Sequence, residues 1–237
     1  MLKYNIGDSM EKEFKSLLKS LDISINDTQY KQFVTYFNVL VEWNEKINLT
    51  AITEEQGVFV KHFYDSLCLV KSVDFTNQTL LDVGSGAGFP SIPLKIIFPQ
   101  LKVTIIDALG KRIKFLELLT KELGLEVELL HGRAEEYKRK HCFDIVTGRA
   151  VANMQMLSEL CIPFVKIDGV FLAMKGSKAM EELELSKCAI KELGGTLESD
   201  IEYMIEDQHR HILVVKKTRK SPQKYPRRFN QIKSNPL

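Results

Sequence analysis

Hydrophobic positions recur at helical intervals through the first third of the chain. Asn26 and Gln29 have the spacing of a helix-capping pair. An apolar stripe follows at helical spacing: Tyr30, Phe33, Val34, Phe37, Leu40 and Val41. A second helical pattern covers residues 58–73. The aromatic stripe predicts a helix that docks on a neighbouring domain.

From Thr79 onward the pattern changes to short β-branched runs that alternate with amphipathic segments. This alternation is typical of βαβ units with a parallel sheet. The predicted strands are 80–84, 103–107, 127–130, 143–147, 170–174, 201–205 and 211–216. The predicted helices include 111–123, 154–164 and 178–193.

The last two predicted strands are joined by residues 206–210 alone. A parallel connection needs a crossover of a dozen or more residues, so these strands must pair antiparallel. The expected fold is therefore α/β, with a doubly wound seven-stranded sheet that ends in a hairpin. That ending differs from the purely parallel dinucleotide-binding fold.

The first strand runs into a glycine-rich loop, Asp82-Val-Gly-Ser-Gly-Ala-Gly-Phe-Pro90. Alternate glycines allow a tight turn and a close approach of the backbone to a ligand. Pro90 suits the first turn of a helix. A second strand ends in Asp107, about 20 residues after the loop, where ribose recognition needs a carboxylate. The context favours a nucleotide-type cofactor.

Two cofactor classes share this geometry. Nicotinamide and flavin dinucleotides favour G-x-G-x-x-G, whereas the spacing here is G-x-G-x-G with Asp82 directly before it. A carboxylate in that place repels a pyrophosphate but neutralises an ammonium group. S-adenosylmethionine carries an ammonium, so a class I methyltransferase is the better interpretation of the loop and hairpin together.

Charge is distributed unevenly along the 237 residues. Of the 33 Lys and Arg, nine follow Asp207, and no acidic residue does. The remaining 24 basic and 31 acidic residues give positions 1–207 a formal charge of −7, against +9 for the rest. From charge alone, a nucleic-acid-binding or membrane-binding end and a merely solvated end are equally good interpretations.

Neither a metal site nor a disulfide framework is expected. The four cysteines, Cys68, Cys142, Cys161 and Cys188, are scattered without C-x-x-C spacing, and the histidines show no ligand pattern. We predict buried thiols. No signal-peptide core or membrane-length apolar run is found, so cytoplasmic location is the default expectation.

Beyond these patterns, the chain resembles the ribosomal small-subunit methyltransferase G family, also called glucose-inhibited division protein B. The resemblance covers nearly the whole chain. Besides the glycine loop, it rests on Trp43–Thr50, His62–Ser66, Arg133–Glu135, Arg149–Ala152 and Lys224–Arg227. It implies S-adenosylmethionine-dependent methylation of a guanine N7 in bacterial 16S ribosomal RNA.

The resemblance also implies a cofactor pocket. Gly84, Gly86 and Phe89 would form the loop side, and Asp107 would bind the ribose. Ala134 and Glu135 would border the adenine, and Arg149 would lie near the methionine end. Attack by a ring-nitrogen lone pair needs no prior proton removal, so no general base is obligatory. We expect Arg149 and Lys175 to act by positioning.

For RNA, the expected phosphate contacts are Lys175, at the end of the fifth strand, and Lys224, Arg227 and Arg228 in the basic tail. The expected organisation is a helical cap (1–76), a methyltransferase domain (77–218) and a basic tail (219–237). A nicotinamide-dependent oxidoreductase and a non-catalytic RNA-binding protein are the alternatives to a methyltransferase.

Overall fold

The computed structural model describes residues 6–149 and 151–237. Ala150, within the Arg149–Ala152 motif, lies outside them. The first part of the chain is helical, as predicted. Asn26 and Gln29 form the expected capping box. The helices of the cap are α1 (Asp8–Lys19), α2 (Asp27–Asn44), α3 (Glu55–Val58), the π-helical turn η1 (Phe59–Tyr64), α4 (Asp65–Leu67) and the 3-10 turn η2 (Cys68–Lys71).

The sheet has seven strands in the order β3-β2-β1-β4-β5-β7-β6. The first five are parallel, and β7 is antiparallel to both of its neighbours. The strands are β1 (Thr79–Val83), β2 (Lys102–Asp107), β3 (Glu128–His131), β4 (Phe143–Arg149), β5 (Val165–Lys175), β6 (Gly195–Ile205) and β7 (Gln208–Lys217). The predicted seven strands and terminal hairpin are confirmed.

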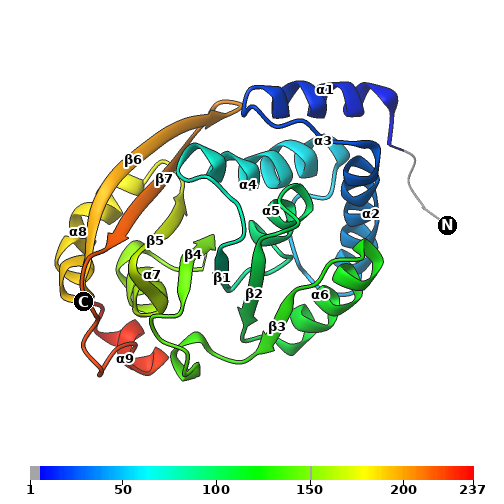
Figure 1. The fold of residues 1–237 in the computed structure, drawn as a ribbon. Coiled ribbons are helices and arrows are strands. Elements are labelled where there is room, and N and C mark those ends of the chain that lie inside the picture. The colour runs from blue at the N-terminus through cyan, green and yellow to red at the C-terminus, as the bar shows by residue number, and fades with distance from the viewer. Residues whose placement is uncertain (1–5, 150) are drawn as a thin grey trace.

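Helices cover both faces of this sheet, which is the doubly wound arrangement (Figure 1). The cap packs with α5 and α6 on one side, while α7 and α8 lie against the other. These elements are α5 (Ser91–Ile97), α6 (Gly110–Leu123), η3 (Ala134–Glu136), α7 (Met154–Cys161), η4 (Ile162–Phe164), α8 (Ala179–Glu192) and α9 (Phe229–Ser234).

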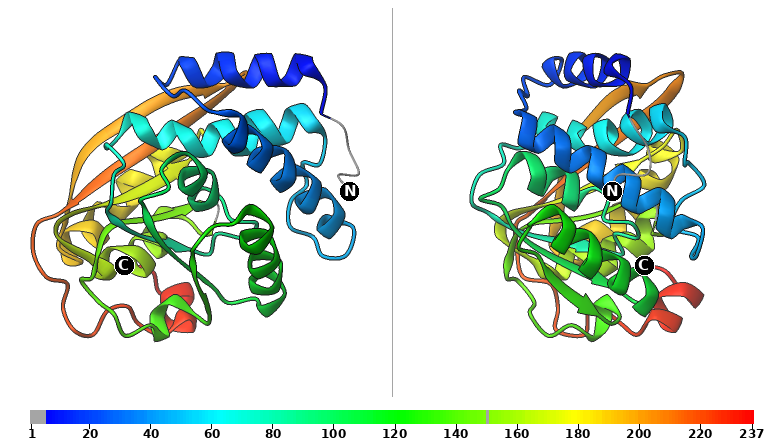
Figure 2. Two further views of the ribbon diagram at one scale, coloured as in Figure 1. Left: turned by 45° about the vertical axis from the view of Figure 1, so that its right-hand side comes forward. Right: turned by 90° about the vertical axis from the view of Figure 1, so that its right-hand side faces the viewer.

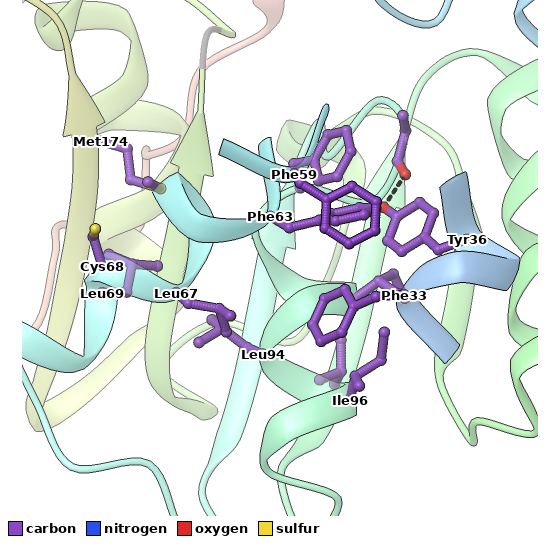
Figure 3. Close-up of a cluster of buried hydrophobic side chains, with 14 of the residues drawn as sticks. Phe33, Tyr36, Phe59, Phe63, Leu67, Cys68, Leu69, Leu94, Ile96 and Met174 are labelled. Atoms are coloured by element: carbon purple, nitrogen blue, oxygen red, sulfur yellow. Dashed lines mark hydrogen bonds between the residues drawn. The ribbon is translucent and has the colours of Figure 1, made fainter. Parts of the chain in front are cut away.

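The aromatic stripe of α2 is buried and joins the cap to the sheet domain. Phe33 and Tyr36 lie 5.0 and 4.9 Å from the Phe63 ring, centroid to centroid, and these rings converge in Figure 3. Tyr36 also stacks on Phe89 at 5.4 Å. The predicted docking face is therefore confirmed, and the hydrophobic core continues without a break across residue 76.

The basic tail is packed against the body rather than solvated. Tyr225 and Ile232 are buried within the second core cluster. Arg227 pairs with the fully buried Glu159. Just before the tail, the Lys217 amine is enclosed and donates to two carbonyl oxygens and to Ser221.

One expectation about the cysteines was wrong. Cys68 and Cys161 are buried, but Cys142 and Cys188 are exposed. Cys142 directly precedes β4, and Cys188 lies on the outward face of α8. A lone cysteine in an amphipathic pattern does not reveal which face it occupies, because it is small and only weakly polar.

Candidate functional site

The glycine loop after β1 adopts the left-handed backbone that its glycines permit. The φ angles of Gly84, Gly86 and Gly88 are 70°, 62° and 96°. A Cβ on Gly88 would lie 2.8 Å from the Tyr36 hydroxyl, so this glycine lets the cap approach the loop. A Cβ on Gly86 would meet nothing within 4 Å. The Gly86 face of the loop is therefore open to a ligand.

Asp82 lies completely buried beneath this loop. Its Oδ2 accepts a hydrogen bond from the Ser91 backbone at 3.3 Å. Its Oδ1 has no partner among the described residues, nor does the buried Ser85 hydroxyl. Burial raises the pKa of Asp82 to about 7, against the lowering effect of the Ser91 hydrogen bonds and of Arg149. An unsatisfied buried carboxylate oxygen fits a site built for a cationic partner.

Asp107 faces the loop from the end of the neighbouring strand β2. Its carboxylate is 2% exposed and accepts from the Gly86 backbone at 3.2 Å. It also accepts from the backbone of Leu109 at 2.9 Å and from Arg112 at 3.4 Å. The predicted ribose carboxylate thus lies against the loop, 21 residues from Gly86 in sequence.

The next strand brings the predicted adenine border to the same edge of the sheet. Ala134 is buried in the turn η3, which follows β3. Glu135 accepts a hydrogen bond from the Phe229 backbone at 3.1 Å. The tail therefore packs beside this border, a contact that the sequence did not predict.

Arg149, at the end of β4, is held by the cap. Its Nη1 donates to Asp65 at 2.9 Å, and its guanidinium lies 4.8 Å from the centre of the Phe89 ring. The other Asp65 oxygen accepts from the Tyr203 hydroxyl at 2.9 Å. The acceptor Asp65 and the donors Arg149 and Tyr203 are buried or nearly buried. These contacts therefore fix the direction of the Arg149 side chain.

His62 completes this cluster. Its ring stacks on Phe89 at 4.6 Å, and its Nδ1 lies 3.2 Å from Arg149 Nη2. Burial, and then the charge of Arg149, lower the pKa of His62 to about 3. The Nε2 of the neutral ring lies 2.7 Å from the Thr50 hydroxyl, and its Nδ1 also lies 3.1 Å from the Lys61 carbonyl oxygen.

A cavity of about 500 Å³ opens beside Arg149, between the cap, the ends of β4 and β5, and the terminal hairpin. Lys175 lines it. The Lys175 amine donates to the Ala152 carbonyl and to Glu182, at 2.8 and 2.7 Å. Lys175 therefore faces the edge of the sheet where it was expected, close to Arg149.

The basic residues of the tail do not line the cavity beside Arg149. Lys224 and Arg228 are exposed, and Arg228 lines a second cavity with Arg133 and Phe229. The Arg227 guanidinium makes a two-pronged contact with Glu159, at 2.6 and 2.8 Å. The structure thus separates the tail from Lys175 and commits Arg227 to an internal pair.

Comparison with known proteins identifies the family. The model of the family "GidB: rRNA small subunit methyltransferase G" matches residues 29–213. The chain belongs to this family. It is 51% identical to the ribosomal RNA small subunit methyltransferase G of Lactococcus lactis, over 95% of this chain and 98% of that one. Identity to the Halalkalibacterium halodurans protein of the same name is 49%, with the same coverage.

Solved structures support the fold. The crystal structure of M. jannaschii TYW2 in complex with AdoMet matches with a TM-score of 0.57 and 18% identity, over 70% of this chain and 79% of that chain. A methyltransferase from Pyrococcus furiosus matches at 0.59 with 14% identity, over 80% and 99%. The seven-stranded sheet of this family member is thus of the class I methyltransferase type, as predicted.

Sequence reasoning missed residues that the cap and β6 supply to the site of this family member. Asp65, Tyr203 and Tyr36 were not proposed, although Asp65 lies in the His62–Ser66 motif.

Within residues 6–149 and 151–237, no group of three or more His, Cys, Asp or Glu side chains could hold a metal ion. The same residues include no helix long and apolar enough to cross a membrane.

Proposed function

We propose that this methyltransferase transfers a methyl group from S-adenosylmethionine to N7 of a guanine in 16S ribosomal RNA, and that it works in the cytoplasm. The observation that best supports the cofactor is the buried Asp82 oxygen without a hydrogen-bond partner at the glycine loop. Asp107 lies across the same loop. Asp107 suits a ribose, whereas Asp82 suits an ammonium and disfavours the pyrophosphate of a dinucleotide.

The proposed cofactor site runs along the carboxyl ends of the first strands. Asp82 neutralises the ammonium and Asp107 accepts from the ribose hydroxyls. The backbone from Gly84 to Gly86, with Phe89, forms the loop wall. Ala134 and Glu135 border the adenine, and Arg149 lies toward the methionine end. When bound, S-adenosylmethionine supplies a methyl group on a cationic sulfur.

The chain's own contribution to catalysis is positioning. Guanine N7 attacks through a ring lone pair, and no side chain needs to remove a proton first. The Asp65 and His62 contacts hold Arg149 over Phe89, and the Glu182 and Ala152 contacts hold Lys175. Pre-set side chains of this kind reduce the entropy lost on reaching the reactive geometry.

Two measurements test this proposal. Calorimetry should detect binding of S-adenosylhomocysteine and no binding of NAD. Labelled methyl from S-adenosylmethionine should enter 16S RNA from a strain that lacks the gene, and should not enter RNA from the parent strain. Binding of NAD alone would indicate an oxidoreductase, and cofactor binding without methyl transfer would indicate a scaffold that only binds RNA.

Cofactor affinity should depend on pH through Asp82. The pKa of Asp82 is raised to about 7, so the folded protein holds a neutral carboxyl below pH 7. The free energy of unfolding that this proton contributes falls as pH rises above the ordinary pKa of Asp, and it is lost once pH has passed 7. Ammonium binding needs the ionised form. The affinity for S-adenosylhomocysteine should therefore fall about tenfold per pH unit below 7.

Calorimetry from about pH 5.5 to 7 checks this slope. Asp82→Asn should bind more weakly and lose the slope. A variant that keeps the wild-type pH dependence would show that another group titrates.

For RNA, we propose that Lys175 contacts the substrate near the reacting base and that Lys224 and Arg228 contact phosphates. Arg227 supports that surface from within, through Glu159. The double change Lys224→Gln/Arg228→Gln should weaken RNA binding. The slope of log affinity against log salt should shrink by roughly 0.7 for each phosphate of single-stranded RNA that the variant no longer neutralises.

The matched control is Lys12→Gln/Lys19→Gln. It removes the same charge from exposed positions of α1, which lies at the opposite end of the molecule from α9 (Figures 1 and 2). Its salt slope should stay at the wild-type value, and affinity for S-adenosylhomocysteine should not change in either variant. Equal slopes in the two double variants would exclude the tail as the RNA surface.

A further inference from the structure

The cavity beside Arg149 has the size and walls of a pocket for one nucleobase. Its volume, about 500 Å³, lies within the roughly 300–1,000 Å³ of small-ligand pockets. Ile52 of the cap, Met174 of β5 and Tyr203 of β6 give it apolar walls. Enzymes that modify a base commonly take it out of the stack and hold it between such side chains.

The charges around the cavity suit a nucleotide. Among the described residues, four cations and two carboxylates, Asp65 and Glu182, line it, and a third carboxylate, Glu206, pairs with the lining Lys61 at 2.9 Å. The neutral His62 adds no charge, because its pKa lies far below 7. The cations are Lys61, Arg149, Lys175 and Arg210. An excess of positive charge attracts a phosphate-bearing ligand.

Two side chains that line the cavity, Arg210 and Glu182, can each make a further hydrogen bond. The Nε of Arg210 is buried and has no hydrogen-bond partner among the described residues. Glu182 accepts from the Met154 backbone at 2.8 Å and from Lys175 at 2.7 Å, both through Oε2. No described residue donates to its Oε1. Both side chains line the cavity, and each keeps one polar atom, a donor on Arg210 and a carboxylate oxygen on Glu182, that no described residue engages.

Guanine matches this pair of groups. Its N7 must face the methyl donor, which leaves its N1–H and 2-amino donors on the opposite edge of the ring. A carboxylate accepts from such donors, whereas adenine presents an unprotonated N1 there. We propose that this cavity holds the extruded target guanine, with Glu182 accepting from its N1–H and 2-amino edge and Arg210 donating to an acceptor of the same nucleotide. This inference rests on the proposed function.

A base analogue tests the role of Glu182. Once the methylated position is mapped, 16S RNA is prepared with guanosine or inosine there, and kcat/KM is measured for both. Inosine lacks only the 2-amino group. Losing a hydrogen bond to a charged partner should lower kcat/KM by about 10- to 150-fold. Equal rates for the two RNAs in the wild-type enzyme would overturn the proposal without any variant.

The Glu182→Gln variant links the effect to this residue. Met154 N–H and Lys175 still require an acceptor, so the amide oxygen takes the Oε2 place and the amide NH2 faces the cavity. That donor would oppose the donors of guanine. Activity on guanosine RNA should fall, and the guanosine-to-inosine ratio should drop below about threefold. A purely structural role would lower both rates and leave the ratio unchanged, which would contradict the proposal.

Three controls complete the experiment. Glu181→Gln, an exposed neighbour on α8, should keep the wild-type ratio. Arg210→Gln should lower kcat/KM on both RNAs without changing the ratio. Affinity for S-adenosylhomocysteine should persist in every variant. If the wild-type enzyme does not methylate guanosine RNA at all, the proposed function fails. If it does and the ratio is insensitive to Glu182→Gln, only the pocket assignment fails.

Discussion

The Gly86→Val variant should fold and lose binding of S-adenosylhomocysteine. A Cβ at this position meets no protein atom within 4 Å, so the new side chain would occupy the space that the cofactor needs beside the loop. Calorimetry should show affinity at least about 100-fold weaker, equivalent to roughly 2.7 kcal/mol. This is the largest effect on function that we expect from a single small side chain.

The φ angle of Gly86 adds a second effect, because a left-handed backbone costs a side-chain residue roughly 1–2 kcal/mol. Gly124, at the end of α6, provides the matched control: its φ is 64°, and a Cβ there also meets nothing within 4 Å. Gly124→Val should lose a similar free energy of unfolding and bind the cofactor normally. Equal affinities in the two variants would place the cofactor away from the loop.

The Arg227→Gln variant should have a lower free energy of unfolding than any other single-residue variant named here. It leaves the Glu159 carboxylate, 0% exposed, without its guanidinium. Breaking a buried ion pair from one side typically costs about 3–5 kcal/mol. Since whole domains are stable by only about 5–15 kcal/mol, urea unfolding should show a clear shift of the midpoint, with no direct change at the cofactor loop.

Two further variants separate this pair from general charge effects. The Glu159→Gln/Arg227→Gln double variant should be less destabilised than Arg227→Gln alone, because no unpaired charge stays buried. Lys224→Gln, at an exposed side chain 3.5 Å from Glu192, should change the free energy of unfolding by no more than about 0.5 kcal/mol. A mild effect of Arg227→Gln would mean that the tail does not depend on this pair.

Local pattern was sufficient to predict the sheet and the loop. The strand runs are short and β-branched, and residues 206–210 leave no room for a crossover helix. The spacing from Gly86 to Asp107 likewise places a carboxylate at the end of the next strand, where the structure has it. These features depend on residues close in sequence, or on one repeated geometry.

The cap's part in the site depends on contacts between distant residues. Arg149 and Asp65 are 84 residues apart, and Tyr203 and Asp65 are 138 apart. Nothing in the local pattern of either partner selects the other. The Arg227–Glu159 pair was missed for the same reason, because its members are 68 residues apart. This pair makes the basic end of the chain part of the packed fold. Charge counting shows where cations occur along the chain but not which of them are already neutralised.

The most direct test of the account is mass-spectrometric mapping of the product. Purified enzyme, S-adenosylmethionine and 16S RNA from a strain that lacks the gene should yield 7-methylguanosine at one position, and the same position should be methylated in RNA from the parent strain. No methylated nucleoside, or a methyl group on another atom or base, would contradict the proposed chemistry.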